Sequence, residues 1–227
     1  MAESEVLIGL FGSGGFGREV MPLVRQAMPG AEIVFVDPAD GAAPVNGHRV
    51  IGENAFFADP RPAKFVNVAI GAGRLRARVL ERALARGAQA LSILSPTASI
   101  FDGNDIGPAA IVCHHAVITA NARIGRGFHC NLGAYVAHDC MIGDFVTFAP
   151  GVKCNGNVEI GDYAYIGAGA VLRQGHPGRP LRIGRGATVG MGAIVVADVP
   201  DGATVAGNPA RPLIRRERRI EAAIPPL

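Results

Sequence analysis

The sequence predicts a two-part chain, in which a small α/β domain with a parallel sheet precedes a parallel β-solenoid. Two observations predict this fold class. An apolar residue occupies every sixth position from Ile100 to Leu172, and a glycine-rich turn at 12–17 follows the first apolar segment. A period of six fits neither a helix nor an exposed strand. It is typical of hexapeptide solenoids, in which each hexad forms one short strand and one corner.

The hexad pattern also indicates how the solenoid is filled. Each hexad has one large and one small inward position, which suits a prism packed with aliphatic layers. Three hexads make one coil, so residues eighteen apart are expected to stack. The hexads resume at Ile183 after a longer loop at 173–182. The unbroken apolar series is Ile100, Ile106, Val112, Ile118, Ile124, Cys130, Val136, Ile142, Phe148, Cys154, Ile160, Ile166 and Leu172.

The segment before the solenoid alternates strand-like and helix-like patterns. Three apolar runs each end in turn residues, and helix-like stretches follow the first and the third run. This β-α-β-α-β order predicts a small Rossmann-like domain with a parallel sheet. The segments are the run 6–11 before Gly12-Ser13-Gly14-Gly15-Phe16-Gly17, the run 32–36 before Asp37, the run 65–70 before Gly71-Ala72-Gly73, and the helix-like stretch 74–86.

These patterns divide the chain into three parts. We expect the Rossmann-like domain at 1–95, the β-helix at 96–213, and a short basic C-terminal helix or tail at 214–227.

Composition excludes several classes of protein. The net charge is only +3, and no run of Lys and Arg interleaves with aromatic residues, so we expect no nucleic-acid partner. No apolar stretch reaches the roughly 18 residues that span a membrane, and the acidic start lacks a signal peptide's pattern. The four cysteines show no CxxC spacing, so we expect no metal site. A cytoplasmic location is the simplest expectation.

His138 and Asp139 are the candidate catalytic pair. They fall on outward positions at a corner of the solenoid. Acyl transfer from a thioester needs a base that takes the proton of the attacking amine or hydroxyl, and a neutral imidazole next to a carboxylate suits that work. Gly156 follows His138 by eighteen residues, so its backbone N–H is a candidate oxyanion donor in the next coil. The sequence alone leaves open that these are an ordinary polar corner and an ordinary corner glycine.

The glycine turn is the candidate phosphate site. Gly12, Gly14 and Gly17 stand between a strand and a helix, which places backbone amides and the helix N-terminus against an anion. Asp37, at the end of the second strand, would then reach a ribose or a base. The alternatives are a simple tight turn and a simple strand-end residue.

The chain resembles the hexapeptide acyltransferases that join a small nucleotide-binding domain to a left-handed parallel β-helix. These include N-acetyltransferases of nucleotide-linked amino sugars and relatives of the sialic acid O-acetyltransferases. The resemblance rests on three segments: Phe11-Gly-Ser-Gly-Gly-Phe-Gly-Arg-Glu-Val20, Ala137-His-Asp-Cys-Met-Ile-Gly-Asp144 and Val205-Ala-Gly-Asn-Pro-Ala-Arg211.

The resemblance implies a homotrimer, with acetyl-CoA bound in the groove between neighbouring solenoids and an amino sugar held near the N-terminal domain. It makes His138 the base and Asp139 its partner, and it places Gly156 near the acetyl group. The residues it indicates for the nucleotide sugar are Gly12, Ser13, Gly14, Gly15, Phe16, Asp37, Gly71 and Arg74. Those it indicates for CoA are Gly156, Gly167, Ala168, Gly190 and Arg211.

We therefore expect an acetyl-CoA-dependent N-acetyltransferase that acts on a nucleotide-linked amino sugar, of the 4-amino-4,6-dideoxy type. The alternatives are a sialic acid O-acetyltransferase and a non-catalytic trimer that binds a nucleotide sugar. A γ-type carbonic anhydrase is a further alternative, because His114, His115 and His129 are outward histidines, but the H-x4-H pair of that family is absent. Phe16 and Thr147 stand where relatives carry histidine.

Overall fold

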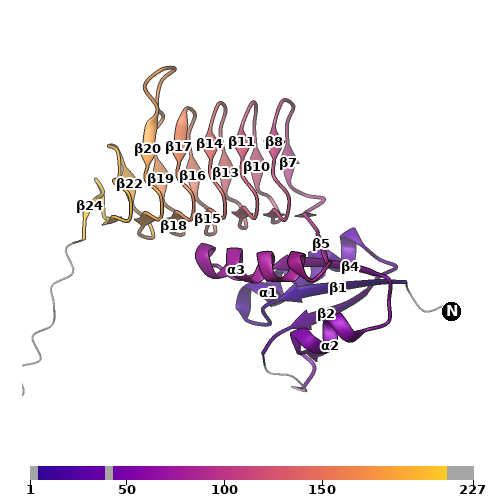
Figure 1. Ribbon diagram of the computed structural model, residues 1–227. Helices are drawn as coiled ribbons and strands as arrows, with labels where there is room; N and C mark the ends of the chain where they lie inside the picture. The colour runs from indigo at the N-terminus through magenta and orange to yellow at the C-terminus, as the bar shows by residue number, and fades with distance from the viewer. Residues whose placement is uncertain (1–4, 39–42, 214–227) are drawn as a thin grey trace, which may run out of the picture.

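The computed structural model describes residues 5–38 and 43–213, which form an N-terminal α/β unit and a parallel β-solenoid (Figure 1). Both parts of the predicted fold class are confirmed. The predicted C-terminal helix, at 214–227, lies outside the described residues. None of the helices within the described ranges combines the length and the apolar character that crossing a bilayer requires.

The N-terminal unit is built on a five-stranded parallel sheet in the order β3-β2-β1-β4-β5. The sequence predicts three of these strands. It misses β3, α2 and β5, because elements of two to six residues are too short to show a period. The elements are β1 (Val6–Phe11), α1 (Gly15–Ala27), β2 (Glu32–Val36), β3 (Val50–Ile51), α2 (Glu53–Ala58), β4 (Ala63–Val68), α3 (Gly73–Ala85) and β5 (Gln89–Ala90).

Helices cover both faces of this sheet, which explains why β1 is apolar throughout. Ile8 and Leu10 pack with α1, whereas Leu7 and Phe11 pack on the other face with residues of α2 and α3. The strands are parallel, so the carboxyl ends of β1, β2 and β4 meet at one edge. The turns that follow these three strands gather there.

The solenoid has three faces, each a parallel sheet apart from one antiparallel terminal strand. We name them by their place relative to the N-terminal unit. The docking face contains β6 (Ile93–Leu94), β9 (Ile111–Val112), β12 (His129–Cys130), β15 (Thr147–Phe148), β18 (Tyr165–Ile166), β21 (Thr188–Val189), β23 (Thr204–Ala206) and the antiparallel β24 (Arg211–Pro212).

The other two faces meet at the edge opposite the docking face. The second face contains β7 (Ser99–Ile100), β10 (Val117–Ile118), β13 (Tyr135–Val136), β16 (Lys153–Cys154), β19 (Val171–Leu172) and β22 (Ile194–Val195). The third face contains β8 (Asp105–Ile106), β11 (Arg123–Ile124), β14 (Met141–Ile142), β17 (Val158–Ile160) and β20 (Leu181–Ile183).

The register confirms the predicted stacking of residues eighteen apart. Val117 pairs with Tyr135, and Tyr135 pairs with Lys153 in the next coil. The inward hexad positions are buried from Val112 onward, and Phe148 meets Phe128 edge to face with ring centroids 5.2 Å apart. Each fully buried aliphatic side chain stabilises the stack by roughly 1.5–3 kcal/mol, so the repeat sustains its own core.

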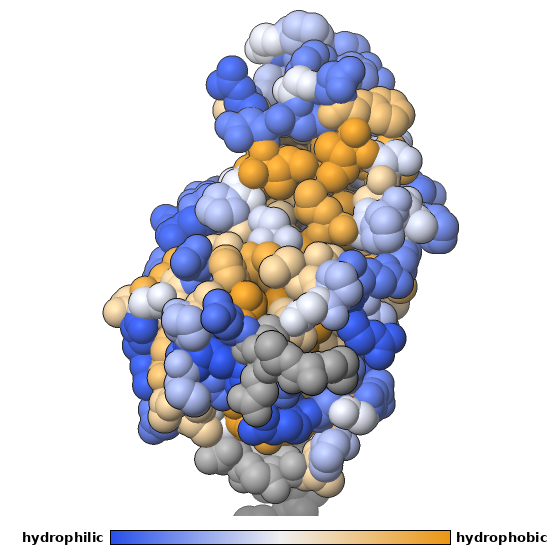
Figure 2. All heavy atoms as spheres, turned by 90° about the vertical axis from the view of Figure 1, so that its right-hand side faces the viewer, coloured by the Kyte–Doolittle hydropathy of each residue, from blue (hydrophilic) through white to orange (hydrophobic). Residues whose placement is uncertain are grey.

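The first coil is the exception to this burial, because no coil precedes it. Leu94, Ile100 and Phe101 remain exposed, and Figure 2 shows an apolar cluster on the end of the molecule that they occupy. The first strand of the solenoid, β6, also lies before Ser95, the residue at which the sequence places the crossing between domains.

The described contacts of the N-terminal unit with the solenoid lie on the docking face and at the corners beside it. Residues of α1 share a core with Ile93, Ile111 and Cys113, and Phe145 packs among residues of α3 and the sheet. The corners that join the second face to the third therefore lie on the side of the solenoid away from the N-terminal unit (Figure 1). The candidate functional residues therefore fall into two groups, one at these corners and one between the N-terminal unit and the docking face.

Candidate active site

His138 and Asp139 lie at a corner between the second and third faces, in the segment that joins β13 to β14. The Nδ1 atom of His138 is 2.8 Å from Oδ2 of Asp139, and both side chains are about half exposed. Asp139 has a φ of 57°, the left-handed conformation that the short Asp side chain tolerates. The corner thus turns the carboxylate back onto the neighbouring imidazole.

Two hydrogen bonds keep the Asp139 carboxylate ionised. The hydrogen bond from His138 lowers the pKa of Asp139, and a second one from Nδ2 of Asn121, at 3.3 Å, lowers it further. An ionised carboxylate only accepts, so in the neutral ring of His138 the proton is on Nδ1 and the lone pair is on Nε2. No residue within the described ranges forms a hydrogen bond with Nε2. The arrangement leaves this nitrogen free to act as a base.

Gly156 lies one coil beyond His138, as the stacking rule predicts. The amide of Asn157 donates to the carbonyl of His138 at 3.0 Å, which fixes the register of the two corners. A Cβ on Gly156 would lie 2.5 Å from both Cε1 and Nε2 of the imidazole, so only glycine leaves the space that the ring occupies. The N–H of Gly156 donates to none of the residues that the structure describes. An unpaired N–H is thus available beside the imidazole.

The loop 173–182 flanks this corner. It forms a short hairpin in which His176 and Arg179 pair, and the amide of Gly175 donates to the carbonyl of Gly156 at 2.9 Å. Together with Asp139 and Asn157, the loop encloses a cavity of about 240 Å³. The break in the hexads after Leu172 therefore marks a segment that lies against the candidate catalytic pair.

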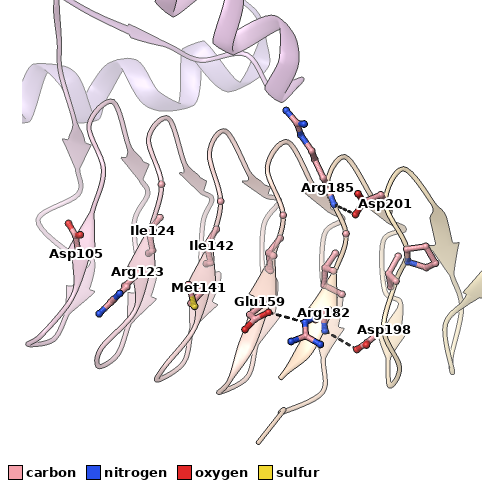
Figure 3. A pocket seen from close by; sticks show the side chains of 18 residues that line it. Asp105, Arg123, Ile124, Met141, Ile142, Glu159, Arg182, Arg185, Asp198 and Asp201 are labelled. Carbon is pink, nitrogen blue, oxygen red and sulfur yellow. Dashed lines mark hydrogen bonds and ion pairs between the residues drawn. The ribbon is translucent and has the colours of Figure 1, made fainter. Parts of the chain in front are cut away.

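A broad groove of about 810 Å³ runs along the third face beside the same corner (Figure 3). Charges of both signs line it: Arg182 contacts Glu159 at 3.0 Å, and its amide donates to Asp198 at 2.9 Å. Met141, the first residue of β14, is half exposed in this groove. None of the residues predicted for catalysis or ligand binding lines it.

The glycine turn is held by Asp37, which the sequence places against a ribose or a base. In the structure, Oδ2 of Asp37 accepts hydrogen bonds from the amide and the hydroxyl of Ser13, at 3.1 and 2.8 Å. Gly12 has a φ of 101°, and a Cβ on Gly17 would lie 1.9 Å from the Gly12 carbonyl oxygen. Both glycines are therefore required for the turn itself, whereas Gly14 and Gly15 are exposed and open to a ligand.

Two cavities lie on either side of the turn 70–73. One, of about 300 Å³, is lined by Gly12, Asp37 and Ile70. The other, of about 520 Å³, lies between the docking face and the segment that contains Gly71 and Arg74. It is lined by Gly71, Ala72, Gly73, Arg74, Thr147, Tyr163, Ala164, Tyr165 and Gly186. Gly71 and Arg74 line the second of these cavities, and the guanidinium of Arg74 is 4.9 Å from the ring centroid of Tyr163.

Phe16 and Thr147, the two departures from the family pattern, both lie where the N-terminal unit meets the docking face. Phe16 packs on the buried ring of His129, with centroids 5.0 Å apart. Thr147 donates from Oγ1 to the Gly71 carbonyl at 2.9 Å. The sequence shows His129 as an outward residue, but it does not show that the N-terminal unit covers that side of the solenoid.

The residues expected to bind CoA divide into two groups. Gly156 lies at the corner of His138. Gly167, Ala168 and Gly190 lie at corners between the docking face and the second face, and Arg211 lies on β24. Within one chain, the structure does not bring these two groups together. The glycine turn is likewise on the opposite side of the solenoid from His138.

The remaining histidines have other surroundings. Nδ1 of His114 lies 2.7 Å from the Ser95 hydroxyl and 2.8 Å from the Thr97 hydroxyl, at a different edge from His138. Burial, reinforced by the charge of Arg76, holds the pKa of His129 well below its ordinary value, so this ring is neutral. Among residues 5–38 and 43–213 there is no group of three or more His, Cys, Asp or Glu side chains placed to hold a metal ion.

Known proteins match both parts of the chain. Residues 7–83 match the PglD N-terminal domain, and residues 139–174 match the bacterial transferase hexapeptide repeats. GDP-perosamine N-acetyltransferase of Escherichia coli O157:H7 is 48% identical over 219 residues, which cover 94% of this chain and 99% of that protein.

Two solved structures extend the comparison. WeeI from Acinetobacter baumannii AYE is 47% identical with a TM-score of 0.90, and the match covers 92% of this chain and 100% of that one. PerB from Caulobacter crescentus, solved in complex with CoA and GDP-perosamine, is 29% identical with a TM-score of 0.82. That match covers 92% of this chain and 96% of the other.

A hexapeptide solenoid that presents a paired imidazole at a corner, joined to a parallel-sheet unit with a glycine turn, defines a hexapeptide-repeat acyltransferase. The relative that is 48% identical over nearly the full length narrows this class to one family. The chain belongs to the GDP-perosamine N-acetyltransferase family, and it is an acetyl-CoA-dependent N-acetyltransferase.

Proposed function

We propose that the protein transfers the acetyl group of acetyl-CoA to the amine of GDP-perosamine, a nucleotide-linked 4-amino-4,6-dideoxy sugar. The observation that carries this proposal is the free Nε2 of the His138–Asp139 pair, in a chain that matches a GDP-perosamine N-acetyltransferase over 94% of its length. The PerB structure, which contains CoA and GDP-perosamine, supports the same pair of substrates.

His138 is the proposed general base. Nε2 accepts a proton from the sugar amine as its nitrogen attacks the thioester carbonyl, and the ring becomes an imidazolium. The C–N bond forms, the C–S bond to CoA breaks, and the imidazolium gives its proton to the leaving CoA thiolate. The Asp139 carboxylate accepts the Nδ1–H hydrogen bond throughout, so it fixes the tautomer and stabilises the charge that forms on the ring. Nδ2 of Asn121 donates a hydrogen bond to Oδ1, the other carboxylate oxygen of Asp139.

Acetyl-CoA supplies an activated thioester carbonyl when it is bound. The residues at the corner fit such a group, because the unpaired N–H of Gly156 lies beside the imidazole and the missing Cβ leaves room for both. This N–H is the proposed donor to the oxygen on which negative charge develops. The hairpin 173–182 covers the same corner, and we propose that it excludes water there.

The N-terminal unit is the proposed site of the nucleotide. Gly12, Ser13, Gly14 and Gly15 present the turn to a diphosphate, Phe16 lies in the first turn of α1 behind it, and Asp37 holds the turn in shape. The cavities on either side of the turn 70–73 give room for the nucleoside and the sugar, with Gly71 and Arg74 at their border. Binding energy from this part positions the amine at a distance from the anchor.

One chain does not complete this site, because His138 and the glycine turn lie on opposite sides of the solenoid. We propose a homotrimer in which His138 and Gly156 of one protomer face Gly167, Ala168, Gly190 and Arg211 of the next. The groove on the third face supports this arrangement, since it lies beside the catalytic corner and exposes Met141 (Figure 3). CoA would then lie between two solenoids. The cytoplasm, where acetyl-CoA and nucleotide sugars are made, is the proposed location.

The test is an acetyl-transfer assay with a panel of acceptors. CoA release is followed with a thiol reagent, and the product by mass spectrometry, for GDP-perosamine, for UDP- and dTDP-linked 4-amino sugars, and for free sialic acid. We expect a kcat/KM for GDP-perosamine that exceeds every other value. Preferred acetylation of a sialic acid hydroxyl, or binding without CoA release, would contradict the proposal.

Replacing Asp37 by alanine is expected to raise the KM for the nucleotide sugar and to change kcat little. The carboxylate accepts two hydrogen bonds from Ser13, and each typically stabilises its geometry by about 0.5–1.5 kcal/mol. The turn loosens, but the catalytic corner is remote from it. Steady-state kinetics with each substrate varied in turn gives the answer. An effect confined to kcat would count against the proposed role.

A further inference from the structure

Arg76 on α3 is a buried cation whose surroundings the proposed chemistry does not use. Its side chain is 1% exposed, and it links the N-terminal unit to the docking face. All three guanidinium nitrogens donate hydrogen bonds. The acceptors are the carbonyls of Gly127 (3.0 Å), Ile70 (2.6 Å), Gly71 (3.2 Å), Phe145 (2.7 Å) and Val146 (3.2 Å), and the hydroxyl of Thr147 (3.0 Å).

The charge of Arg76 has no countercharge. All six acceptors are neutral, and no carboxylate of the described residues forms an ion pair with it. Burial lowers the pKa of Arg76 to about 9, so the guanidinium is charged at neutral pH. The nearby ring of His129 is neutral. Its hydrogen bonds are satisfied, but no described carboxylate neutralises its charge, so a net positive field remains at this point of the interior.

Arg76 also sets the direction of the turn before α3. Its Nη1 holds the carbonyls of Ile70 and Gly71. Both peptide bonds are trans, so the N–H groups of Gly71 and Ala72, which share these peptide planes, point away from the guanidinium. Neither N–H donates to a described residue. The cation therefore fixes two unpaired N–H groups in one orientation.

The same contacts place Arg76 directly behind the walls of the two cavities. Gly71 and Thr147 line the cavity of about 520 Å³, and Ile70 lines the one of about 300 Å³. Each of these residues accepts a hydrogen bond from Arg76. In the low-dielectric interior, the field of the charge extends through these walls with little screening.

We propose that Arg76 is a positioning residue for the diphosphate of the nucleotide-linked substrate, because it aims the N–H groups of Gly71 and Ala72 at the anion and supplies an unneutralised positive charge behind them. This inference rests on the proposed function for the ligand, a nucleoside diphosphate. It adds a residue that never touches the substrate itself.

The test compares Arg76→Gln, Arg76→Lys and Arg78→Gln. Arg78 is the matched control, since it carries the same charge two residues further along α3 but is exposed. The readouts are the Kd for GDP and for GMP by calorimetry, the KM for acetyl-CoA, and the melting temperature. For Arg76→Gln we expect a Kd for GDP that is raised roughly tenfold to hundredfold, the range for lost hydrogen bonds to a charged group.

The pattern of effects separates positioning from mere folding. The loss in Arg76→Gln should be larger for GDP than for GMP, smaller in Arg76→Lys, and absent in Arg78→Gln, while the KM for acetyl-CoA stays unchanged. A folded Arg76→Gln that binds GDP like the wild type would overturn the inference. So would an equal weakening for GDP, GMP and acetyl-CoA.

If the Arg76 variants fail to fold, Thr147→Val tests the same inference. It removes one hydroxyl of the same network and preserves the shape of the side chain. We expect a rise in the Kd for GDP of about threefold to tenfold, and no change would contradict the inference. Failure of the proposed function has a different signature: GDP binds and depends on Arg76, but GDP-perosamine is not acetylated. If the wild-type protein binds no nucleoside diphosphate, both the inference on Arg76 and the proposed function are wrong.

Discussion

Replacing His138 by alanine is expected to lower kcat by roughly 10²–10⁴, the contribution typical of a positioned general base. The side chain is about half exposed, and its one described hydrogen bond runs to Asp139. The fold and the assembly should therefore survive the change. CoA release under saturating GDP-perosamine and acetyl-CoA measures the loss, and the melting temperature and the molar mass in solution confirm that the protein is intact.

The matched control for this variant is His115→Asn. His115 is an exposed corner histidine at a different edge, and its φ of 58° is a conformation that Asn adopts readily. We expect wild-type kinetics from it. Asp139→Asn should fall between the two, since it leaves the imidazole in place but removes the carboxylate that fixes the tautomer. A His138→Ala enzyme with more than about a tenth of the wild-type kcat would contradict the assignment of the base.

Replacing Gly156 by alanine is expected to lower kcat by roughly 10²–10³. The new Cβ would lie 2.5 Å from Nε2 and Cε1 of His138, closer than real contacts allow, so the imidazole must turn away from its position. The KM for GDP-perosamine should change little, because the proposed nucleotide site lies in the N-terminal unit, away from this corner.

Gly30→Ala is the control for this second variant. Gly30 has no heavy atom within 4 Å of an added Cβ and is exposed, so the same chemical change should leave the kinetics intact. The φ of Gly156 lies outside the left-handed region, so alanine fits its backbone, and the melting temperature should fall only modestly. A Gly156→Ala enzyme with full activity would show that the imidazole does not work in the position described.

The solenoid and the position of the candidate catalytic pair could be predicted because the sequence pattern that determines them is local. Each hexad sets its own strand and corner, and the eighteen-residue repeat then fixes which corners stack. That rule alone places Gly156 above His138, and the structure confirms it through the hydrogen bond from Asn157 to the His138 carbonyl. The position of the loop 173–182 beside this corner follows in the same way from the break in the repeat.

What the sequence did not reveal depends on how separate elements pack. Arg76 looks like one more basic residue on an exposed helix, and His129 like an outward corner histidine. Both are buried because the N-terminal unit covers the docking face, a contact between residues more than fifty positions apart. A pattern of periodicity carries no information on such contacts. It likewise did not show that Asp37 binds Ser13 in its own domain.

In the proposed trimer a base on one protomer meets a nucleotide held by another, and the activity of mixed oligomers shows whether the site is shared in this way. Two inactive variants are co-expressed with different tags: His138→Ala, and Gly14→Glu, which sets a carboxylate on an exposed position of the turn against the diphosphate. A trimer that contains both variants keeps one intact site of three, so the doubly purified enzyme should regain about a third of the wild-type turnover. Mixed oligomers no more active than either parent would rule out a site shared between protomers.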